Sequence, residues 1–151
     1  MQSDPELYNA TVKTPRFSID GEYIAKCVDV HDGDTCQLVF KVSETSHLAR
    51  FTCRILGYNC AEVAGVGISD VEKERGKICR DFMRKLILGK IVNIIVNGFD
   101  RHGRPLVNIW IDISAEIGVH AQKHVSVSEL ILLHGYGVKY DGTGEKQWKG
   151  L

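Results

Sequence analysis

The sequence lacks the features that mark membrane-spanning, secreted and strongly charged proteins. None of its apolar runs approaches the roughly 18 residues that a spanning helix needs. Residues 1–16 are polar and contain no apolar stretch like that of a signal peptide, so we expect an intracellular protein, cytoplasmic or nuclear. The 19 basic and 19 acidic residues balance, so overall charge gives no indication of nucleic-acid binding, and any basic surface must be local.

The five cysteines lack a spacing that indicates a metal site or a disulfide framework. Their number is odd, and no C-x-x-C pair occurs. Three of them lie in runs typical of β-strands. We therefore expect buried free thiols in a reducing compartment. The residues are Cys27, Cys36, Cys53, Cys60 and Cys79.

Length and composition favour one domain. A chain of 151 residues with 44% hydrophobic and 25% charged residues can bury a single core without staples. We assign residues 1–16 to a flexible N-terminal tail and residues 17–151 to one domain. The sequence contains no internal repeat and no low-complexity segment.

Apolar patterning predicts five strands and two helices. Runs rich in Val, Ile, Phe and Cys predict the strands Tyr23–Val30, Thr35–Val42, Leu48–Gly57, Lys90–Asn97 and Pro105–Ile113. Capping boxes open the predicted helices Ser69–Leu88 and Ser126–His134, and a glycine ends each. The order predicts a mainly β fold of the α+β class, a five-stranded OB-type β-barrel with packed helices. The stripe expected to face the core on the first helix is Val71, Ile78, Phe82 and Leu86.

Four short polar segments lie at the ends of predicted strands. They are Asp32-Gly33-Asp34-Thr35, Arg54-Ile55-Leu56-Gly57, Asn59-Cys60-Ala61-Glu62 and Asp100-Arg101-His102-Gly103-Arg104. Each alone reads as an ordinary turn or a solvated strand face. Their joint order and spacing resemble the staphylococcal nuclease (thermonuclease-like) family, whose pattern runs D-G-D-T, R-L-L-G, a loop ending in P-E, a helix and D-x-x-G-R. The resemblance covers residues 20–140.

The resemblance implies a Ca²⁺-dependent nuclease that hydrolyses DNA and RNA to 3′-phosphate products. Arg54 and Arg104 would clamp the phosphate, and Glu62 would activate the attacking water. These residue types suit the chemistry, because guanidinium groups bind phosphate oxygens bidentately and a carboxylate can take a proton from water. The expected ligands of the metal are Asp34, Asn59 and the backbone carbonyl of Cys60, with Asp32 behind them.

The segment Asn59-Cys60-Ala61-Glu62 departs from the family pattern, which has an aspartate at the position of Asn59. An amide oxygen binds a hard cation without contributing charge, so metal affinity is the property most affected. Ca²⁺ is the expected cofactor, with Mg²⁺ or Mn²⁺ as alternatives. Residues 114–125 lengthen the link to the second helix, and we interpret His120 and His124 there as solvated rather than metal-binding.

Single-stranded DNA and RNA are the expected partners, without a membrane and with a monomer presumed. Three further residues near the inferred site are possible substrate contacts: Arg101, His102 and Tyr140. A non-catalytic module that binds nucleic acid or protein is the alternative function, since some domains of this family have lost their catalytic residues. A plain OB-type oligonucleotide binder ranks third, because it would not require the two arginines and the glutamate together.

Overall fold

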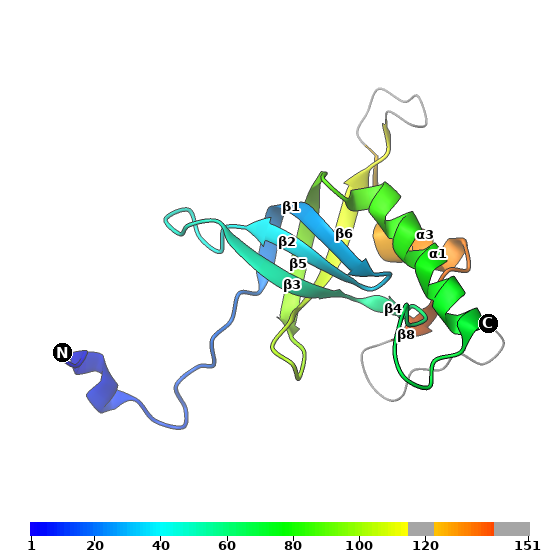
Figure 1. Cartoon of the computed structure of the whole chain (residues 1–151). Helices are drawn as coiled ribbons and strands as arrows, with labels where there is room; N and C mark the ends of the chain where they lie inside the picture. The colour runs from blue at the N-terminus through cyan, green and yellow to red at the C-terminus, as the bar shows by residue number, and fades with distance from the viewer. Residues whose placement is uncertain (115–122, 141–151) are drawn as a thin grey trace.

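Five strands among the described residues form a closed barrel in this computed structural model, which describes residues 1–114 and 123–140 (Figure 1). Antiparallel pairing runs in the order β3-β2-β1-β5-β6, and a short parallel pairing of β3 with β6 closes the barrel. The predicted OB-type barrel of the α+β class is confirmed. The strands are β1 (Gly21–Asp32), β2 (Thr35–Phe40), β3 (Ala49–Ile55), β5 (Ile91–Phe99) and β6 (Pro105–Asp112).

Three short strands lie outside the predicted set. β4 (Gly57–Asn59) pairs with β8 (Val138–Tyr140), and β7 (His124–Ser126) extends the barrel sheet beside β6. The predicted strand Leu48–Gly57 ends earlier than expected, at Ile55, and Gly57, with a φ of 101°, begins β4. Strands of three residues carry too little alternation to be recognised from sequence.

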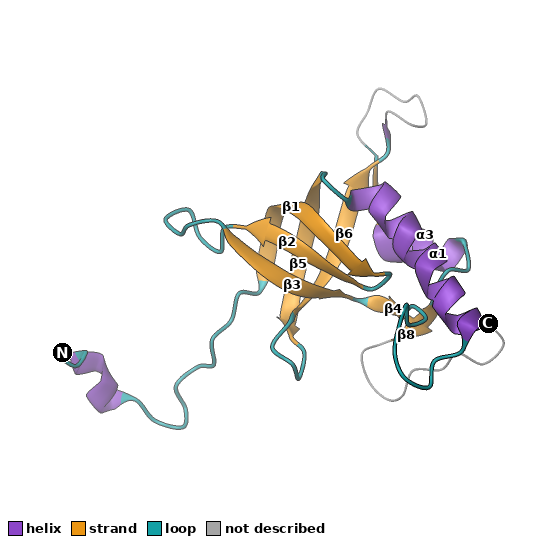
Figure 2. Ribbon diagram, in the orientation of Figure 1, coloured by secondary structure: helices purple, strands orange, loops and turns teal. Residues whose placement is uncertain are grey.

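Two α-helices of the described chain pack beside one end of the barrel (Figure 2). They are α1 (Asp70–Ile87) and α3 (Val127–Leu133), close to the predicted bounds. Ser69 caps α1, since its hydroxyl accepts a 3.1 Å hydrogen bond from the Glu72 N–H. Ser126 is the N-cap of α3 but makes no such bond. None of the described helices is long and apolar enough to cross a membrane.

The set of α1 residues predicted to face the core is wrong. The buried positions mostly lie one residue further along the chain than the predicted ones. Val71 and Ile78 are exposed, and Phe82 and Leu86 are only partly buried against the core. The buried face of α1 instead consists of Gly76, Cys79, Met83 and Ile87. This face has the same helical spacing, but it begins with a glycine and a cysteine, which a search for large apolar residues passes over.

The barrel interior is filled mainly by side chains from alternate positions of β1, β2, β5 and β6, together with Cys53 and Ile55 at the end of β3. Cys27, Cys36 and Cys53 lie inside it as free, buried cysteines, as predicted. The N-terminal tail carries a 3₁₀-helix, Pro5–Asn9, and none of the tail residues is buried. His120 lies outside the described residues.

Candidate functional site

A cleft of about 680 Å³ lies where the β1–β2 turn, the segment after β3 and the β5–β6 turn meet. The structure brings nine of the ten predicted site residues to its walls, although they come from distant parts of the chain. The tenth, Cys60, is buried beside it. The nine are Asp32, Asp34, Arg54, Asn59, Glu62, Arg101, His102, Arg104 and Tyr140.

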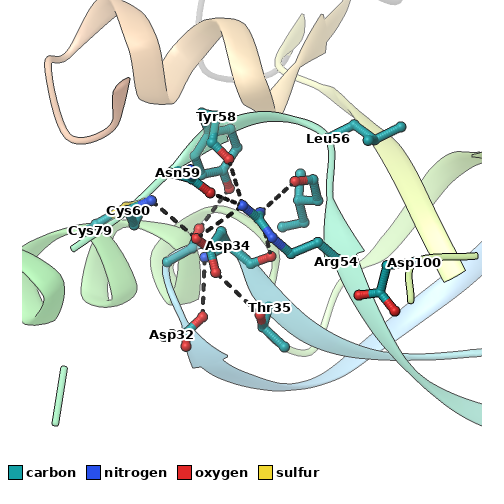
Figure 3. A network of polar contacts seen from close by, with 12 residues as sticks. Asp32, Asp34, Thr35, Arg54, Leu56, Tyr58, Asn59, Cys60, Cys79 and Asp100 are labelled. Atoms are coloured by element: carbon teal, nitrogen blue, oxygen red, sulfur yellow. Dashed lines mark hydrogen bonds and ion pairs between the residues drawn. A yellow bond between two sulfur atoms is a disulfide. The ribbon is translucent and has the colours of Figure 1, made fainter. Parts of the chain in front are cut away.

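The β1–β2 turn supplies two carboxylates. Asp34 is buried, and its side chain accepts hydrogen bonds from the Thr35 hydroxyl at 3.2 Å and from the Cys60 N–H at 3.1 Å (Figure 3). Asp32 sits closer to solvent and accepts from the Asp34 N–H at 3.4 Å. Burial, followed by the charge of Asp34 and a smaller effect of Glu62, raises the pKa of Asp32 to about 6. Negative charge is therefore crowded at this wall of the cleft, which favours a bound cation.

Glu62 is held near these carboxylates by the close packing of its backbone on α1. The contact occurs at Gly76, where an added Cβ would lie 2.6 Å from the carbonyl oxygen of Ala61 and 2.7 Å from that of Glu62. Only glycine leaves room for the loop to approach the helix this closely. Gly76 is thus a positioning residue that sequence reasoning missed, and its place on the buried face of a helix was the only sign of it.

Arg54 is buried at the end of β3 and connects three segments of the site (Figure 3). Nη1 donates to the backbone carbonyls of Asp34 at 3.3 Å and Ile55 at 2.7 Å. Nη2 donates to the carbonyl of Tyr58 at 3.0 Å and to Oδ1 of Asn59, and lies 3.4 Å from the Asp34 carboxylate. These acceptors occupy as many N–H groups as the two terminal nitrogens carry. In this arrangement Arg54 has no terminal N–H left for a phosphate.

Arg104 presents its guanidinium differently. Its Nε lies 2.6 Å from Oδ2 of Asp100, and none of the described residues accepts a hydrogen bond from its two terminal nitrogens. Asp100 also accepts from the N–H groups of His102 and Arg104, each at 2.9 Å. Partial burial raises the pKa of Asp100, but these hydrogen bonds and the charge of Arg104 outweigh it, so the pKa is lowered. Asp100 therefore stays ionised and aims Arg104 along the cleft.

Asn59 and Cys60 follow Tyr58 on the buried side of the cleft. Asn59 turns its oxygen toward Arg54, and its Nδ2 has no hydrogen-bond partner among the described residues. Cys60 forms a disulfide with Cys79 of α1, so the prediction that all five cysteines are free thiols is wrong for this pair. The disulfide packs against the acidic turn, that is, the β1–β2 turn with Asp32 and Asp34. A Cβ added at Gly33 of this turn would lie 2.8 Å from the Cβ of Cys79. Sequence spacing did not reveal that this loop lies on the helix.

Arg101, His102 and Tyr140 line the outer part of the cleft. Arg101 and His102 are exposed in the β5–β6 turn, with 3.4 Å between Arg101 Nε and His102 Nε2. Tyr140 ends β8, opposite Gly57 of β4. Its pairing with β4 brings the end of the described chain to the site, an arrangement that the sequence pattern did not predict.

The oxygen-rich cleft does not contain a preformed metal cage. Across residues 1–114 and 123–140, no group of three or more His, Cys, Asp or Glu side chains is arranged to hold a metal ion. Comparison with known proteins adds no identification, because no protein-family model and no curated protein matches the chain.

Proposed function

We propose that this protein is a Ca²⁺-dependent nuclease that hydrolyses phosphodiester bonds in DNA and RNA, as the resemblance to the staphylococcal nuclease family implies. The observation that supports it best is the meeting of three carboxylates and two arginines in one cleft: Asp32, Asp34, Glu62, Arg54 and Arg104. The stability of a barrel does not require carboxylates and arginines to gather at one end. Phosphoryl transfer uses both, because positive groups stabilise the phosphate charge and carboxylates bind a cation or accept a proton.

Arg104 is the side chain best suited to bind the scissile phosphate. Its terminal N–H groups are directed by Asp100 and are not used by other described residues. A guanidinium keeps its charge and can meet two phosphoryl oxygens at once, so it stabilises the charge that grows as water attacks. Arg54 adds positive charge from a buried position.

Glu62 is the proposed base. It would accept a proton from water as the water oxygen forms a bond to phosphorus. The bond from phosphorus to the 5′ oxygen then breaks, the 5′ oxygen takes up a proton, and the 3′ oxygen keeps the phosphate.

The donors at the acidic wall fit a hard divalent cation. Asp32 and Asp34 offer carboxylate oxygens beside the Cys60 backbone, and oxygen donors favour Ca²⁺ or Mg²⁺ over softer metals. Burial and the charges of Asp34 and Glu62 raise the pKa of Asp32, and a bound cation would offset both effects. When bound, Ca²⁺ would supply positive charge toward the phosphoryl oxygens.

The substrate class follows from the kinds of group in the cleft. Arginine and metal contacts address phosphates, which carry no sequence information, so little base specificity is expected. Tyr140 offers an aromatic ring on which an unpaired base can stack, which favours single strands.

Digestion of denatured DNA and of RNA tests this proposal. Purified protein should cut both in Ca²⁺, leave 3′-phosphate ends, and stop in chelator. Arg104→Ala should lose at least ~10²-fold in rate, whereas Arg50→Ala, an exposed arginine of β3 outside the cleft, should lose much less. Intact substrates across Ca²⁺, Mg²⁺ and Mn²⁺ would refute the enzyme.

One observation favours the alternative, a non-catalytic module that binds nucleic acid or protein. The terminal N–H groups of Arg54 are all engaged within the protein, which suits a structural role as well as a catalytic one. Binding of single-stranded nucleic acid without cleavage in the same experiment would establish this alternative.

A further inference from the structure

Asn59 is fully buried, yet only the oxygen of its side-chain amide has a hydrogen-bond partner among the described residues. Its Oδ1 accepts a hydrogen bond from Nη2 of Arg54, while its Nδ2 has no partner in the described part of the chain. Leaving a buried donor unpaired destabilises the folded state. The contact with Arg54 is therefore the polar interaction that accounts for an asparagine at this position.

The orientation of the amide is set by Arg54. If the amide were turned over, its NH₂ group would face the guanidinium, and both groups would be donors. Turning the oxygen away toward a cation in the cleft would remove the acceptor from Nη2. The structure has this oxygen on Arg54, whose positive charge would repel a cation that shared the same oxygen.

The charges around Arg54 explain why a neutral acceptor fits. The buried guanidinium already has one carboxylate beside it, that of Asp34 at 3.4 Å. A second carboxylate at position 59 would leave an excess negative charge in a buried site, which is costly unless a cation joins it. With a neutral Asn59, the positive charge of Arg54 is balanced by the carboxylate of Asp34.

We propose that Asn59 is a positioning residue: it holds the Arg54 guanidinium in place and does not bind the metal. Through Arg54 it fixes the carbonyl and carboxylate of Asp34 and the carbonyl of Tyr58. The acidic turn and the segment that leads to Glu62 are thereby joined before any cation or substrate arrives. This inference rests on the proposed nuclease function and assigns Asn59 a role other than that of metal ligand.

Two substitutions separate the two roles of Asn59. Asn59→Leu has nearly the same shape but no acceptor, and it leaves the charge unchanged. Asn59→Asp keeps an oxygen for Arg54. Asn59→Ser, whose side chain is too short to reach the guanidinium, replaces the leucine variant if that variant does not fold.

Three measurements are made on each full-length variant. Calorimetry gives the Kd for Ca²⁺, and cleavage of denatured DNA gives the rate at saturating Ca²⁺. NMR of ¹⁵N-labelled protein shows whether the terminal N–H groups of Arg54 give separate signals, as they do when rotation is hindered. Arg50, exposed on the same strand, is the internal control for freely rotating groups.

A positioning role predicts a specific combination for Asn59→Leu. The Kd for Ca²⁺ stays within about twofold of the original, because the substitution removes no metal ligand and no charge. The rate at saturating Ca²⁺ falls at least ~10-fold, because releasing Arg54 separates the turn of Asp34 from the segment that leads to Glu62, and a small displacement of a reacting group slows the reaction. The Arg54 signals merge, and Asn59→Asp restores both separate signals and most of the rate.

A metal-ligand role predicts the opposite combination. In that case Asn59→Leu weakens Ca²⁺ binding by about tenfold or more, while the Arg54 signals stay separate, and the positioning role is refuted. Failure of the unsubstituted protein to cut DNA or RNA would refute the nuclease function instead. The Arg54 signals of the variants would still decide the role of Asn59.

Discussion

Asp100→Asn tests whether Arg104 is aimed by its neighbour. The substitution preserves the size of the side chain and the oxygen that accepts from the N–H groups of His102 and Arg104. It replaces Oδ2, which lies 2.6 Å from Nε of Arg104, with an NH₂ group. Two donors then face each other, so Arg104 must turn away from its present position.

The expected loss is larger in rate than in stability. The side chains of Asp100 and Arg104 are 15% and 33% exposed, and such a pair contributes at most about 1 kcal/mol to folding. A displacement of about 1 Å can cost ~10²-fold in rate, so we expect cleavage to slow by about 10- to 100-fold. The effect should fall on kcat more than on KM, because Arg104 acts on charge that develops during the reaction.

The stability difference should also depend on pH in a defined direction. The pKa of Asp100 is lowered in the folded protein, so its carboxylate stabilises the fold fully above about pH 4, where it ionises in the unfolded chain. This contribution is lost as the pH falls through the lowered pKa. Urea unfolding of both forms at pH 7 and near pH 2.5 should therefore show a gap that closes on acidification.

Asp20→Asn is the matched control. Its Oδ1 accepts from the Gly98 N–H at 2.6 Å, near the end of β5 that leads into the turn of Arg104, but Asp20 does not line the cleft. We expect a comparable change in stability and an unchanged rate of cleavage. If Asp100→Asn keeps its rate within about twofold, Asp100 does not position Arg104 for catalysis.

Three other changes probe the opposite wall of the cleft. Glu62→Gln should lower the rate at least ~10²-fold with an unchanged thermal midpoint, and near-normal activity would remove Glu62 as the base. Gly76→Ala should lower both stability and rate although alanine favours helices, because its Cβ meets the loop backbone at 2.6 Å; a more stable, active variant would contradict this packing. Reduction of Cys60–Cys79, whose partners are 19 residues apart, should cost about 3 kcal/mol in urea unfolding, and an equal midpoint in a dithiol would show that the disulfide does not stabilise the fold.

The strands and the start of α1 could be predicted from the sequence because their patterns are local. Alternating apolar residues predict strands, and a serine followed by glutamate predicts where α1 begins. Motifs at strand ends then meet because OB-type strands are short and their ends lie together. Asp34, Arg54 and Arg104, which the resemblance implied as site residues, share one cleft for this reason.

What sequence did not reveal depends on contacts between segments. Tyr140 was expected near the site, but the pairing of β4 with β8 that brings it to the cleft is not indicated by any residue of these three-residue strands. The disulfide of Cys60 requires knowing that a loop lies on α1. The hydrogen bonds of Arg54 depend on where backbone carbonyls point, which residue types do not encode.

Closure of the barrel also governs when the site comes into existence during folding. The two arginines are brought together by the parallel pairing of β3 with β6, where Arg54 lies opposite Leu106 and the Leu56 N–H donates to Val107 at 2.8 Å. Contacts between segments so far apart along the chain carry a high loop-closure entropy, so they tend to form after the local hairpins. In a chain whose hairpins have formed but whose β3–β6 pairing has not, the residues that line the cleft are present but are not yet brought together. Any chemistry performed there is thus confined to chains that have finished folding.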